Sequence, residues 1–258
     1  MDIGDSSTRS GRSEMNLAVI AGTGALDLFE VLDEFAVNSR YGSPSAPLSR
    51  IRIGERHAWF LPRHGKPHAI PPHAINYRAN IDILRQSGVD RVVAVHAVGG
   101  IDPNLKPGSL VVPDQLIDYT WGRAHTFSDS ADDSLAHIEF AEPFSGSTRM
   151  ALLSAARKAG ISVHQSGCYA VTQGPRLETT AEIARLAADG CTLVGMTAMP
   201  EAALAREAGL DYASLSVVAN PAAGVTDQVI SLEEIHRVLG AAMLEVGRLL
   251  RDGAGELA

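Results

Sequence analysis

The chain has 258 residues, of which 45% are apolar and 20% are charged, and its formal net charge is −8. This apolar fraction excludes an intrinsically disordered protein, and the acidic balance argues against general nucleic-acid binding, which needs an excess of Lys and Arg. Two cysteines, Cys168 and Cys191, are too few for a disulfide scaffold, so a cytoplasmic location is expected. No apolar run approaches the roughly 18 residues of a membrane helix, so no membrane partner is expected.

The polar residues 1–16 are expected to form a flexible N-terminal extension, and residues 17–258 a single folded domain. The apolar run Leu17–Ala21 is shorter than the roughly 7 to 15 residues of a signal-peptide core. It is typical of a buried strand, and it enters the glycine turn Gly22-Thr23-Gly24.

Short apolar runs then alternate with helical periods along the chain. Strands are expected at Ile51–Ile53, Ala58–Leu61, Arg91–Ala97, Leu110–Val112, Gln115–Asp118, Ile161–His164, Cys168–Thr172, Leu193–Met196 and Tyr212–Val218. Helices are expected at His73–Gln86, Thr148–Ala159 and Pro200–Ala208, and after the capping boxes that begin at Thr179 and Ser231. This alternation indicates an α/β fold in which helices cover a sheet. Residues 122–136 are rich in Ser and Asp, and a mobile loop is expected there.

Three polar features lie where such a sheet would end its strands. The glycine turn exposes N–H groups that suit an anion, although an ordinary tight turn fits the same residues. Arg63-His64-Gly65 follows a strand and offers donors to phosphate oxygens, or it is a plain surface loop. Asn220-Pro221 ends another strand, where open α/β sheets place ligand contacts, but Asn before Pro is also a common turn.

Other chemistries find little support in the sequence. A nicotinamide-dependent oxidoreductase would need a third glycine at the position of Asp27. The segment that holds His64, His68 and His73 contains three prolines, so no single helix aligns these side chains and no metal site is expected. No Gly-x-Ser-x-Gly motif is present, and neither cysteine has a catalytic context, which argues against a covalent hydrolase.

Seven short marks occur in the order and spacing of one family. They are Gly22-Thr23-Gly24, Arg63-His64-Gly65, Asn76-Tyr77-Arg78-Ala79-Asn80, Ala97-Val98-Gly99-Gly100, Gly174-Pro175-Arg176, Met196-Thr197 with Met199-Pro200-Glu201, and the strand end at Asn220. From about Leu17 to Leu250 the sequence resembles the trimeric purine nucleoside phosphorylase and methylthioadenosine phosphorylase family. The resemblance implies a mixed, twisted β-sheet covered by helices, of the nucleoside phosphorylase type.

The same resemblance implies a pentosyltransferase that performs phosphorolysis. Inorganic phosphate attacks C1′ of the ribose, the N-glycosidic bond breaks, and a sugar 1-phosphate and a free purine base are released. Phosphate is then the co-substrate, no metal or organic cofactor is needed, and the chain forms a homotrimer with sites at its subunit interfaces. The residues that match the family's phosphate site are Thr23, Arg63, His64, Ala97 and Thr197.

Further residues match positions that contact the nucleoside. Met196 matches the residue packed under the ribose, Leu177 one that packs on the base, and His137 one that reaches the 5′-substituent of the neighbouring subunit. Asn220 is expected to stabilise N7 of the leaving base by a hydrogen bond, while a water supplies the proton. Asn220 and His64 are therefore the expected catalytic residues.

Two local differences bear on the base. Asn220 and Ala222 stand where family members that take 6-aminopurines carry two Asp, and an Asn amide can donate to O6 or N7 of a 6-oxopurine. Gln173 stands before Gly-Pro-Arg, where 6-oxopurine relatives usually carry Glu. Gln can accept from N1–H but suits the two adjacent donors of guanine less well, which favours hypoxanthine.

The 5′ side is interpreted from the last helix. Leu232 and Ile235 match positions that flank the 5′ group, and two aliphatic residues favour a methylthio group, although core packing of an amphipathic helix fits them too. The expected substrate is 5′-methylthioinosine. The alternatives are inosine or guanosine, methylthioadenosine, and a non-catalytic nucleoside-binding protein on the same fold. His96 stands where relatives usually have Asn or Thr, and the sequence leaves its role open.

Overall fold

The computed structural model describes residues 16–22, 28–129, 137–227 and 231–257. The strands are β1 (Leu17–Ala21), β2 (Glu30–Phe35), β3 (Leu48–Ile53), β4 (Arg56–Pro62), β5 (Arg91–Gly100), β6 (Leu110–Val111), β7 (Gln115–Asp118), β8 (Cys168–Val171), β9 (Leu193–Gly195) and β10 (Asp211–Pro221). The helices are the short 3-10 turn η1 (Pro72–Ala74), α1 (Tyr77–Gln86), α2 (Gly146–Ala159), α3 (Thr180–Ala188), α4 (Glu201–Glu207), α5 (Leu232–Asp252) and α6 (Ala254–Leu257).

The strands of the described residues form one mixed sheet. Their order is β2-β3-β4-β1-β5-β9-β8-β7, with β10 paired to β5 and β6 paired to β10. The pairs β1–β4, β1–β5, β5–β10, β7–β8 and β8–β9 are parallel, and the pairs β2–β3, β3–β4, β5–β9 and β6–β10 are antiparallel. The predicted α/β class with a mixed sheet is therefore confirmed.

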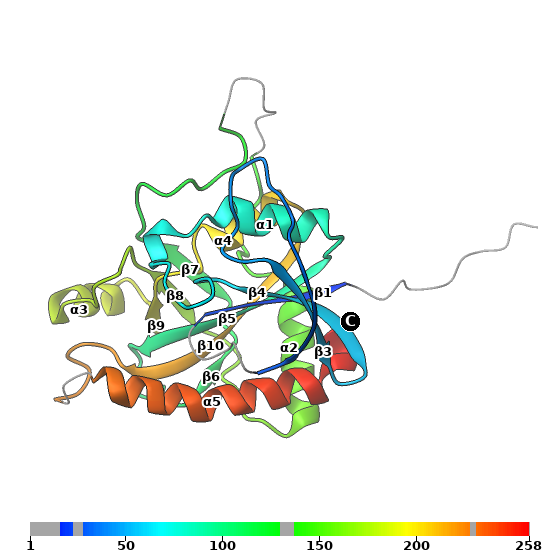
Figure 1. Cartoon of the computed structure of the whole chain (residues 1–258). Coiled ribbons are helices and arrows are strands. Elements are labelled where there is room, and N and C mark those ends of the chain that lie inside the picture. The colour runs from blue at the N-terminus through cyan, green and yellow to red at the C-terminus, as the bar shows by residue number, and fades with distance from the viewer. Residues whose placement is uncertain (1–15, 23–27, 130–136, 228–230, 258) are drawn as a thin grey trace, which may run out of the picture.

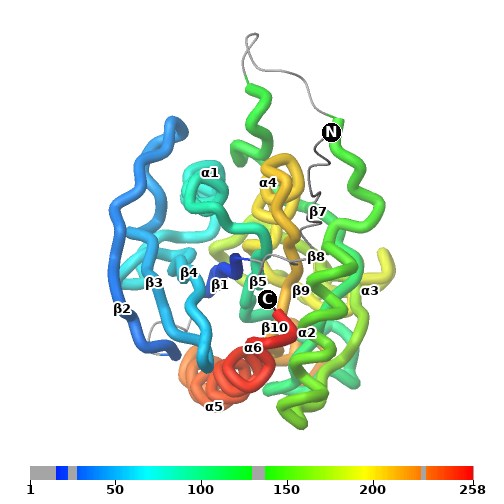
Figure 2. The backbone as a smooth tube through the Cα atoms, turned by 90° about the vertical axis from the view of Figure 1, so that its right-hand side faces the viewer, coloured from blue at the N-terminus to red at the C-terminus, as the bar shows by residue number. Residues whose placement is uncertain are grey.

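Helices cover both faces of the sheet, with α1 and α4 on one side and α2, α5 and α6 on the other (Figure 1, Figure 2). In β1, Val19 and Ala21 pack into the apolar cluster that includes α5, whereas Ala18 and Ile20 pack into the cluster that includes α1 and α4. Because both faces are buried, β1 is apolar at every position.

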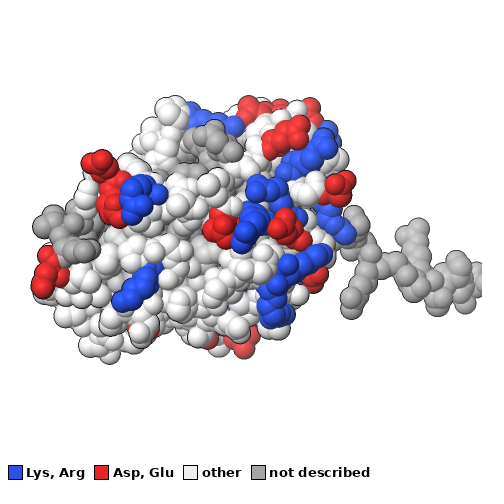
Figure 3. Space-filling view, turned by 90° about the horizontal axis from the view of Figure 1, so that it is seen from below, with Lys and Arg blue, Asp and Glu red and all other residues white. Residues whose placement is uncertain are grey.

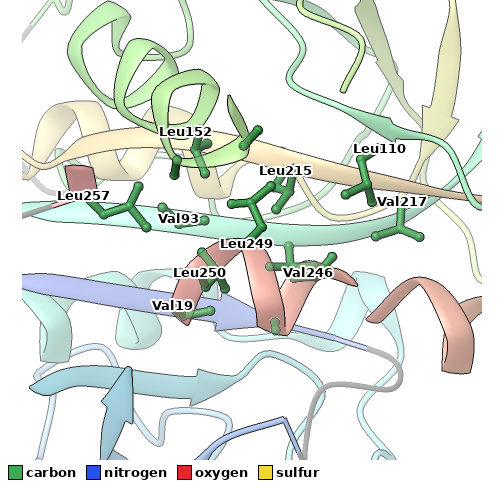
Figure 4. Close-up of a cluster of buried hydrophobic side chains, with 14 of the residues drawn as sticks. Val19, Val93, Leu110, Leu152, Leu215, Val217, Val246, Leu249, Leu250 and Leu257 are labelled. Carbon is green, nitrogen blue, oxygen red and sulfur yellow. The ribbon is translucent and has the colours of Figure 1, made fainter. Parts of the chain in front are cut away.

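The cluster on the α5 side fixes the helices against the central strands (Figure 4). Val93 of β5 and Leu215 of β10 belong to it, together with Leu152 of α2 and Val246 and Leu249 of α5. These side chains are almost completely excluded from solvent. The last helices are therefore part of the core that supports β5 and β10.

Strand β5 has three partners, and this creates an opening in the sheet. Its residues Arg91–Val95 pair with β1, nearly its whole length pairs with β10, and Gly99 and Gly100 pair with β9. Because β1 ends at Ala21, β5 continues beyond it, and Ala97 is exposed in a strand that is otherwise largely buried. Such a change of partners is where α/β sheets place their ligands.

The surface carries charges of both signs. Figure 3 shows Lys and Arg side chains interspersed with Asp and Glu on the face seen from below. On α5, Arg237 pairs with Glu234 at 2.6 Å and Arg248 with Glu245 at 2.8 Å. Among the described residues, no helix combines the length and the apolar character that crossing a membrane would require.

Three sequence expectations differ from the structure. Residues Ile161–His164 are not a strand, since only His164 forms an isolated bridge, to Val111. The expected helix His73–Gln86 is divided, because the side chain of Asn76 accepts a hydrogen bond from Ala79 N and begins α1 there. Strand β2 was not expected, because as a largely exposed edge strand it has no buried apolar pattern.

Two segments were expected to be mobile, 1–16 and 122–136, and their residues 1–15 and 130–136 lie outside the described residues. The described part of the second segment, residues 122–129, contains neither helix nor strand. Within it, however, Arg123 is buried and makes several hydrogen bonds. Arg123 therefore anchors this stretch at its N-terminal end, whereas its composition had indicated a mobile loop.

The core assignment of α5 can be tested with two leucines of the same helix. Leu249 is 0% exposed and Leu244 is 67% exposed. Leu249→Ala is expected to lower the free energy of unfolding by about 2 to 5 kcal/mol, because it removes buried methyl groups and leaves a cavity. Leu244→Ala is expected to change it by less than about 0.5 kcal/mol. Urea unfolding at equilibrium measures both, and equal effects would contradict the packing.

Candidate active site

A cavity of about 360 Å³ lies at the opening beside Ala97. Its walls come from the loops after β1 and β4, the second half of β5, the end of β9, the end of β10, and the segment before α3. Strand β9 runs antiparallel to β5, with Val194 opposite Gly99, so its end points back towards Ala97. Segments that lie far apart in the sequence are thereby brought to one place.

The buried ion pair between Arg63 and Glu201 joins two of these segments. Arg63 Nε lies 2.7 Å from one carboxylate oxygen of Glu201, and Nη2 lies 2.8 Å from the other. The two side chains are 1% and 0% exposed. Burial alone would lower the pKa of Arg63, but the charge and hydrogen bonds of Glu201 outweigh burial and raise it. Arg63 is therefore a permanent cation.

The hydrogen-bond inventory of Arg63 leaves one donor for a ligand. Besides Glu201, Nη2 contacts His96 Nε2 at 3.2 Å, and Nη1 donates to the carbonyl of Val95 at 3.0 Å. A guanidinium has five N–H groups, so within the described contacts one N–H on Nη1 is left. Gly22 lies at this nitrogen, since a Cβ built there would be 3.5 Å away. Arg63 thus offers a single directed donor rather than the two-pronged contact that its residue type suggests.

His64 is held with one ring nitrogen at the cavity. Its Nδ1 lies 2.8 Å from the carbonyl of Ile70, which can only accept, so Nδ1 carries the proton. Burial lowers the pKa of His64 to about 4, with the charge of Arg63 contributing to the shift. At neutral pH the ring is uncharged and Nε2 is an acceptor. It can take a hydrogen bond from a protonated phosphate oxygen or a sugar hydroxyl, and it donates only when protonated.

The other expected contacts of this cavity also line it. Ala97 and Thr197 line the same cavity as Arg63 and His64, and so does Met196, which follows β9. Leu177 lines the cavity and is half-exposed, and Ile235 reaches it from α5. The structure therefore brings together residues that the sequence assigned to phosphate and residues that it assigned to the sugar and the base.

Asn220 and Glu178 bring polar groups to the same cavity. Asn220 Nδ2 donates to the carbonyl of Pro221 at 2.7 Å, which leaves its carbonyl oxygen and a second N–H for a ligand. Glu178 accepts a hydrogen bond from Thr172 Oγ1 at 2.6 Å through one oxygen, and its other oxygen has no contact of this kind among the described residues. Among the described residues of this lining, Glu178 is the one acidic side chain, and the sequence analysis did not single it out.

Arg123 is a second residue that the sequence analysis did not identify. Its guanidinium donates to the backbone carbonyls of Met196, Met199 and Gln173, at distances of 2.5 to 2.9 Å. These carbonyls lie after β8 and around the segment between β9 and α4. Arg123 therefore fixes two walls of the cavity relative to each other. The sequence held no signal for this, because carbonyl groups are present at every residue.

Three expected site residues do not line this cavity, and a fourth lies outside the described part of the chain. Gln173 lines a neighbouring hollow of about 330 Å³, where its side-chain oxygen accepts from Trp121 N and Arg123 Nε. Leu232, at the start of α5, is 69% exposed, and His137 is exposed as well. Thr23 lies outside the described residues. The structure thus leaves the roles of these four residues as predictions.

The uncharged state of His64 makes stability depend on pH. The unfolded chain binds a proton at His64 near pH 6.5, whereas the folded chain does so near pH 4. The free energy of unfolding is therefore expected to fall as the pH is lowered from 7 to 5 in phosphate-free buffer. His64→Gln removes the titrating group and is expected to reduce this slope. Urea unfolding at several pH values measures it, and an unchanged slope would contradict the assignment. Buried His96, whose pKa burial lowers as well, contributes to the slope that remains.

Comparison with known proteins gives a consistent result. The family model of the phosphorylase superfamily matches residues 16–252. A relative from Xylella fastidiosa, named probable S-methyl-5′-thioinosine phosphorylase, is 55% identical over 244 residues, which are 93% of this chain and 98% of the relative. A relative of the same name from Xanthomonas campestris is 49% identical and covers 94% of this chain and 96% of its own length.

A solved structure agrees with the fold. Methylthioadenosine phosphorylase from Schistosoma mansoni in complex with adenine has a TM-score of 0.88 and 34% sequence identity, and the match covers 94% of this chain and 91% of that one. The predicted class, a pentosyltransferase of the nucleoside phosphorylase type with phosphate as co-substrate, is confirmed by these matches. The chain therefore belongs to the phosphorylase superfamily.

Proposed function

We propose that this enzyme cleaves S-methyl-5′-thioinosine with inorganic phosphate, giving hypoxanthine and 5-methylthioribose 1-phosphate. The names of the Xylella and Xanthomonas relatives support this substrate. The composition of the cavity supports it independently, because its lining combines donors for an anion, apolar surface and two polar groups suited to a purine edge. The choice of a 6-oxopurine as the base rests on the contacts of Glu178 and Asn220.

The anion end of the cavity suits phosphate as a nucleophile. Arg63 directs one N–H into it, Thr197 adds a hydroxyl, and His64 Nε2 can accept from a protonated phosphate oxygen. When the N-glycosidic bond breaks, positive charge develops on the sugar, and a phosphate held beside C1′ stabilises that charge. Holding the two reactants in contact also removes the entropic cost of bringing them together.

The base end of the cavity favours a 6-oxopurine. Hypoxanthine presents N1–H as a donor, which the free carboxylate oxygen of Glu178 can accept, and O6 as an acceptor for the amide N–H of Asn220. Adenine presents the reverse pattern, with an acceptor at N1 and donors at N6. It would place acceptor against acceptor in a site that is partly closed to water, and such mismatches discriminate strongly. This assignment gives Glu178 the role that the sequence analysis gave to Gln173.

The leaving base needs a proton or a hydrogen bond at N7. Asn220 lies at the end of β10, and its free carbonyl oxygen can accept from a protonated N7. Among the described residues that line the cavity, Glu178 is the one carboxylate, and we assign it to N1 rather than to N7. A water is therefore the proposed proton source, and Asn220 stabilises the product of that transfer.

The 5′ side of the cavity is less polar than its anion end and its base end. Ile235 lines it and packs on the apolar cluster of α5, which suits a methylthio group better than a hydroxyl. Leu232 and His137 are exposed in the single chain, and we propose that they meet the 5′ group when subunits assemble.

The function is tested by purine release from 5′-methylthioinosine, methylthioadenosine and inosine, each with and without phosphate. Release is expected to require phosphate and to be fastest from 5′-methylthioinosine. Preference for methylthioadenosine would overturn the base assignment, and preference for inosine would overturn the 5′ assignment. Phosphate-independent binding without release would favour the nucleoside-binding alternative.

The Glu178→Gln variant tests the assignment of the base more directly. Removing the charged acceptor is expected to reduce kcat/KM for 5′-methylthioinosine by roughly 1 to 3 kcal/mol, and to reduce it less for methylthioadenosine, whose N1 can accept from the new amide. The control is Glu245→Gln, the same chemical change on the surface of α5, where Glu245 pairs with Arg248. An unchanged ratio of the two substrates in Glu178→Gln would remove Glu178 from base recognition.

We further propose that the chain is a cytoplasmic homotrimer whose sites lie at subunit interfaces. The exposure of Leu232 and His137, which the resemblance assigns to the 5′ pocket, supports this assembly. Light scattering coupled to gel filtration is expected to give about three times the mass of 27.3 kDa of one chain. A monomer with full activity would contradict the shared site.

A further inference from the structure

His96 lies behind Arg63 rather than in the cavity. It is the residue before Ala97 in β5, so its side chain points to the opposite face of the strand. The imidazole is 1% exposed and is absent from the cavity lining. Its ring is T-shaped against Tyr169, with the two centroids 5.5 Å apart. In this geometry His96 therefore does not directly contact a ligand in the cavity.

The contacts of His96 determine which ring nitrogen carries the proton. Arg63 Nη2, 3.2 Å from Nε2, can only donate, so Nε2 is the acceptor. The proton is then on Nδ1, which donates to Ser214 Oγ at 2.9 Å, and Ser214 Oγ lies 2.9 Å from Ser216 Oγ. Burial and the charge of Arg63 hold the pKa of His96 well below its ordinary value, which keeps this neutral tautomer.

The other groups around His96 do not replace it as an acceptor for Arg63. Glu201 Oε1 is 3.8 Å from His96 Nε2 and already accepts from Arg63 Nη2 and from the hydroxyl of Tyr212. The Tyr212 hydroxyl is 3.5 Å from Nε2, at the limit of a hydrogen bond. Within the described contacts, His96 is thus the acceptor for the second N–H of Arg63 Nη2.

These acceptors together fix how the guanidinium is turned about its own axis. Glu201 binds one edge of the planar group, and the carbonyl of Val95 and His96 Nε2 bind the nitrogens at its far end. With four N–H groups held by the protein, the orientation of the fifth is fixed as well, and its nitrogen, Nη1, lies beside Gly22 of the cavity lining. An unpaired N–H at the buried Nη2 would instead favour a rotated or water-filled arrangement.

We propose that His96 is a positioning residue for phosphate binding, which holds the Arg63 guanidinium so that its last N–H points at the phosphate. It does this without touching the phosphate itself. The inference rests on the proposed function in one respect, since it takes phosphate to be the anion that Arg63 binds.

Two amide variants of His96 separate positioning from simple packing. In His96→Gln the side-chain amide can reach the position of Nε2 and offer its oxygen to Arg63. In His96→Asn the shorter amide reaches only the position of Nδ1, so it can keep Ser214 but not Arg63. Both variants are neutral, and each serves as the matched control for the other.

The readout is the affinity of the full chain for inorganic phosphate, measured by calorimetry without nucleoside. His96→Asn is expected to weaken phosphate binding about tenfold, and His96→Gln to restore it to within about threefold of the unmodified protein. In turnover assays the KM for phosphate is expected to rise in His96→Asn, while the KM for the nucleoside stays nearly constant.

Three results would overturn the inference. Equal weakening in both variants would mean that His96 acts only through packing. Unchanged phosphate affinity in His96→Asn would mean that Arg63 does not depend on it. Absence of phosphate binding by the unmodified chain would mean that Arg63 faces no phosphate. If phosphate binds but no nucleoside is cleaved, the proposed function fails while the calorimetric comparison still decides the role of His96.

Discussion

The site depends on keeping one positive charge inside the protein. An isolated buried guanidinium would be very unfavourable, and Arg63 is tolerated because Glu201 lies against it and the carbonyl of Val95 and His96 satisfy further N–H groups. Arg63 follows β4 and Glu201 begins α4, so the ion pair also joins two parts of the chain that are 138 residues apart. Loss of either partner would leave a buried charge unpaired, so this contact constrains the fold and the site together.

The same contact explains why the cavity is formed before a ligand arrives. Arg63 is fixed by Glu201, His64 is fixed by the carbonyl of Ile70, and the walls after β8 and β9 are fixed by Arg123. The groups that hold Arg63 belong to β5 and α4, and those that hold Arg123 lie in the segments that follow β8 and β9. A nucleoside and a phosphate would therefore enter a site whose donors and acceptors already have their directions, which reduces the reorganisation that catalysis requires.

The sequence predicted the parts of the structure that depend on local patterns. Strands β1, β5 and β10 are largely apolar because both faces of the sheet are covered. The sequence patterns at Thr179 and Ser231 mark the starts of α3 and α5, with a full capping box at Thr179 and the N-cap bond alone at Ser231. It did not predict the parts that depend on distant partners. Glu201 was known as part of a motif, but its contact with Arg63 is visible only in three dimensions. Arg123 lay in a segment whose Ser and Asp content suggested a loose loop, and its partners are backbone carbonyls that no composition reveals.

Side chains along β5 alternate between the two faces of the strand, and this alternation limits how the enzyme can change during evolution. His96 faces the buried side of the strand and Ala97 faces the cavity, and three partner strands hold that register. Inserting or deleting one residue between Arg91 and His96 would exchange the two faces, placing an imidazole in the cavity and leaving Arg63 without its acceptor. In β5, therefore, a change of length alters the facing of every later side chain at once, whereas a substitution alters only its own position.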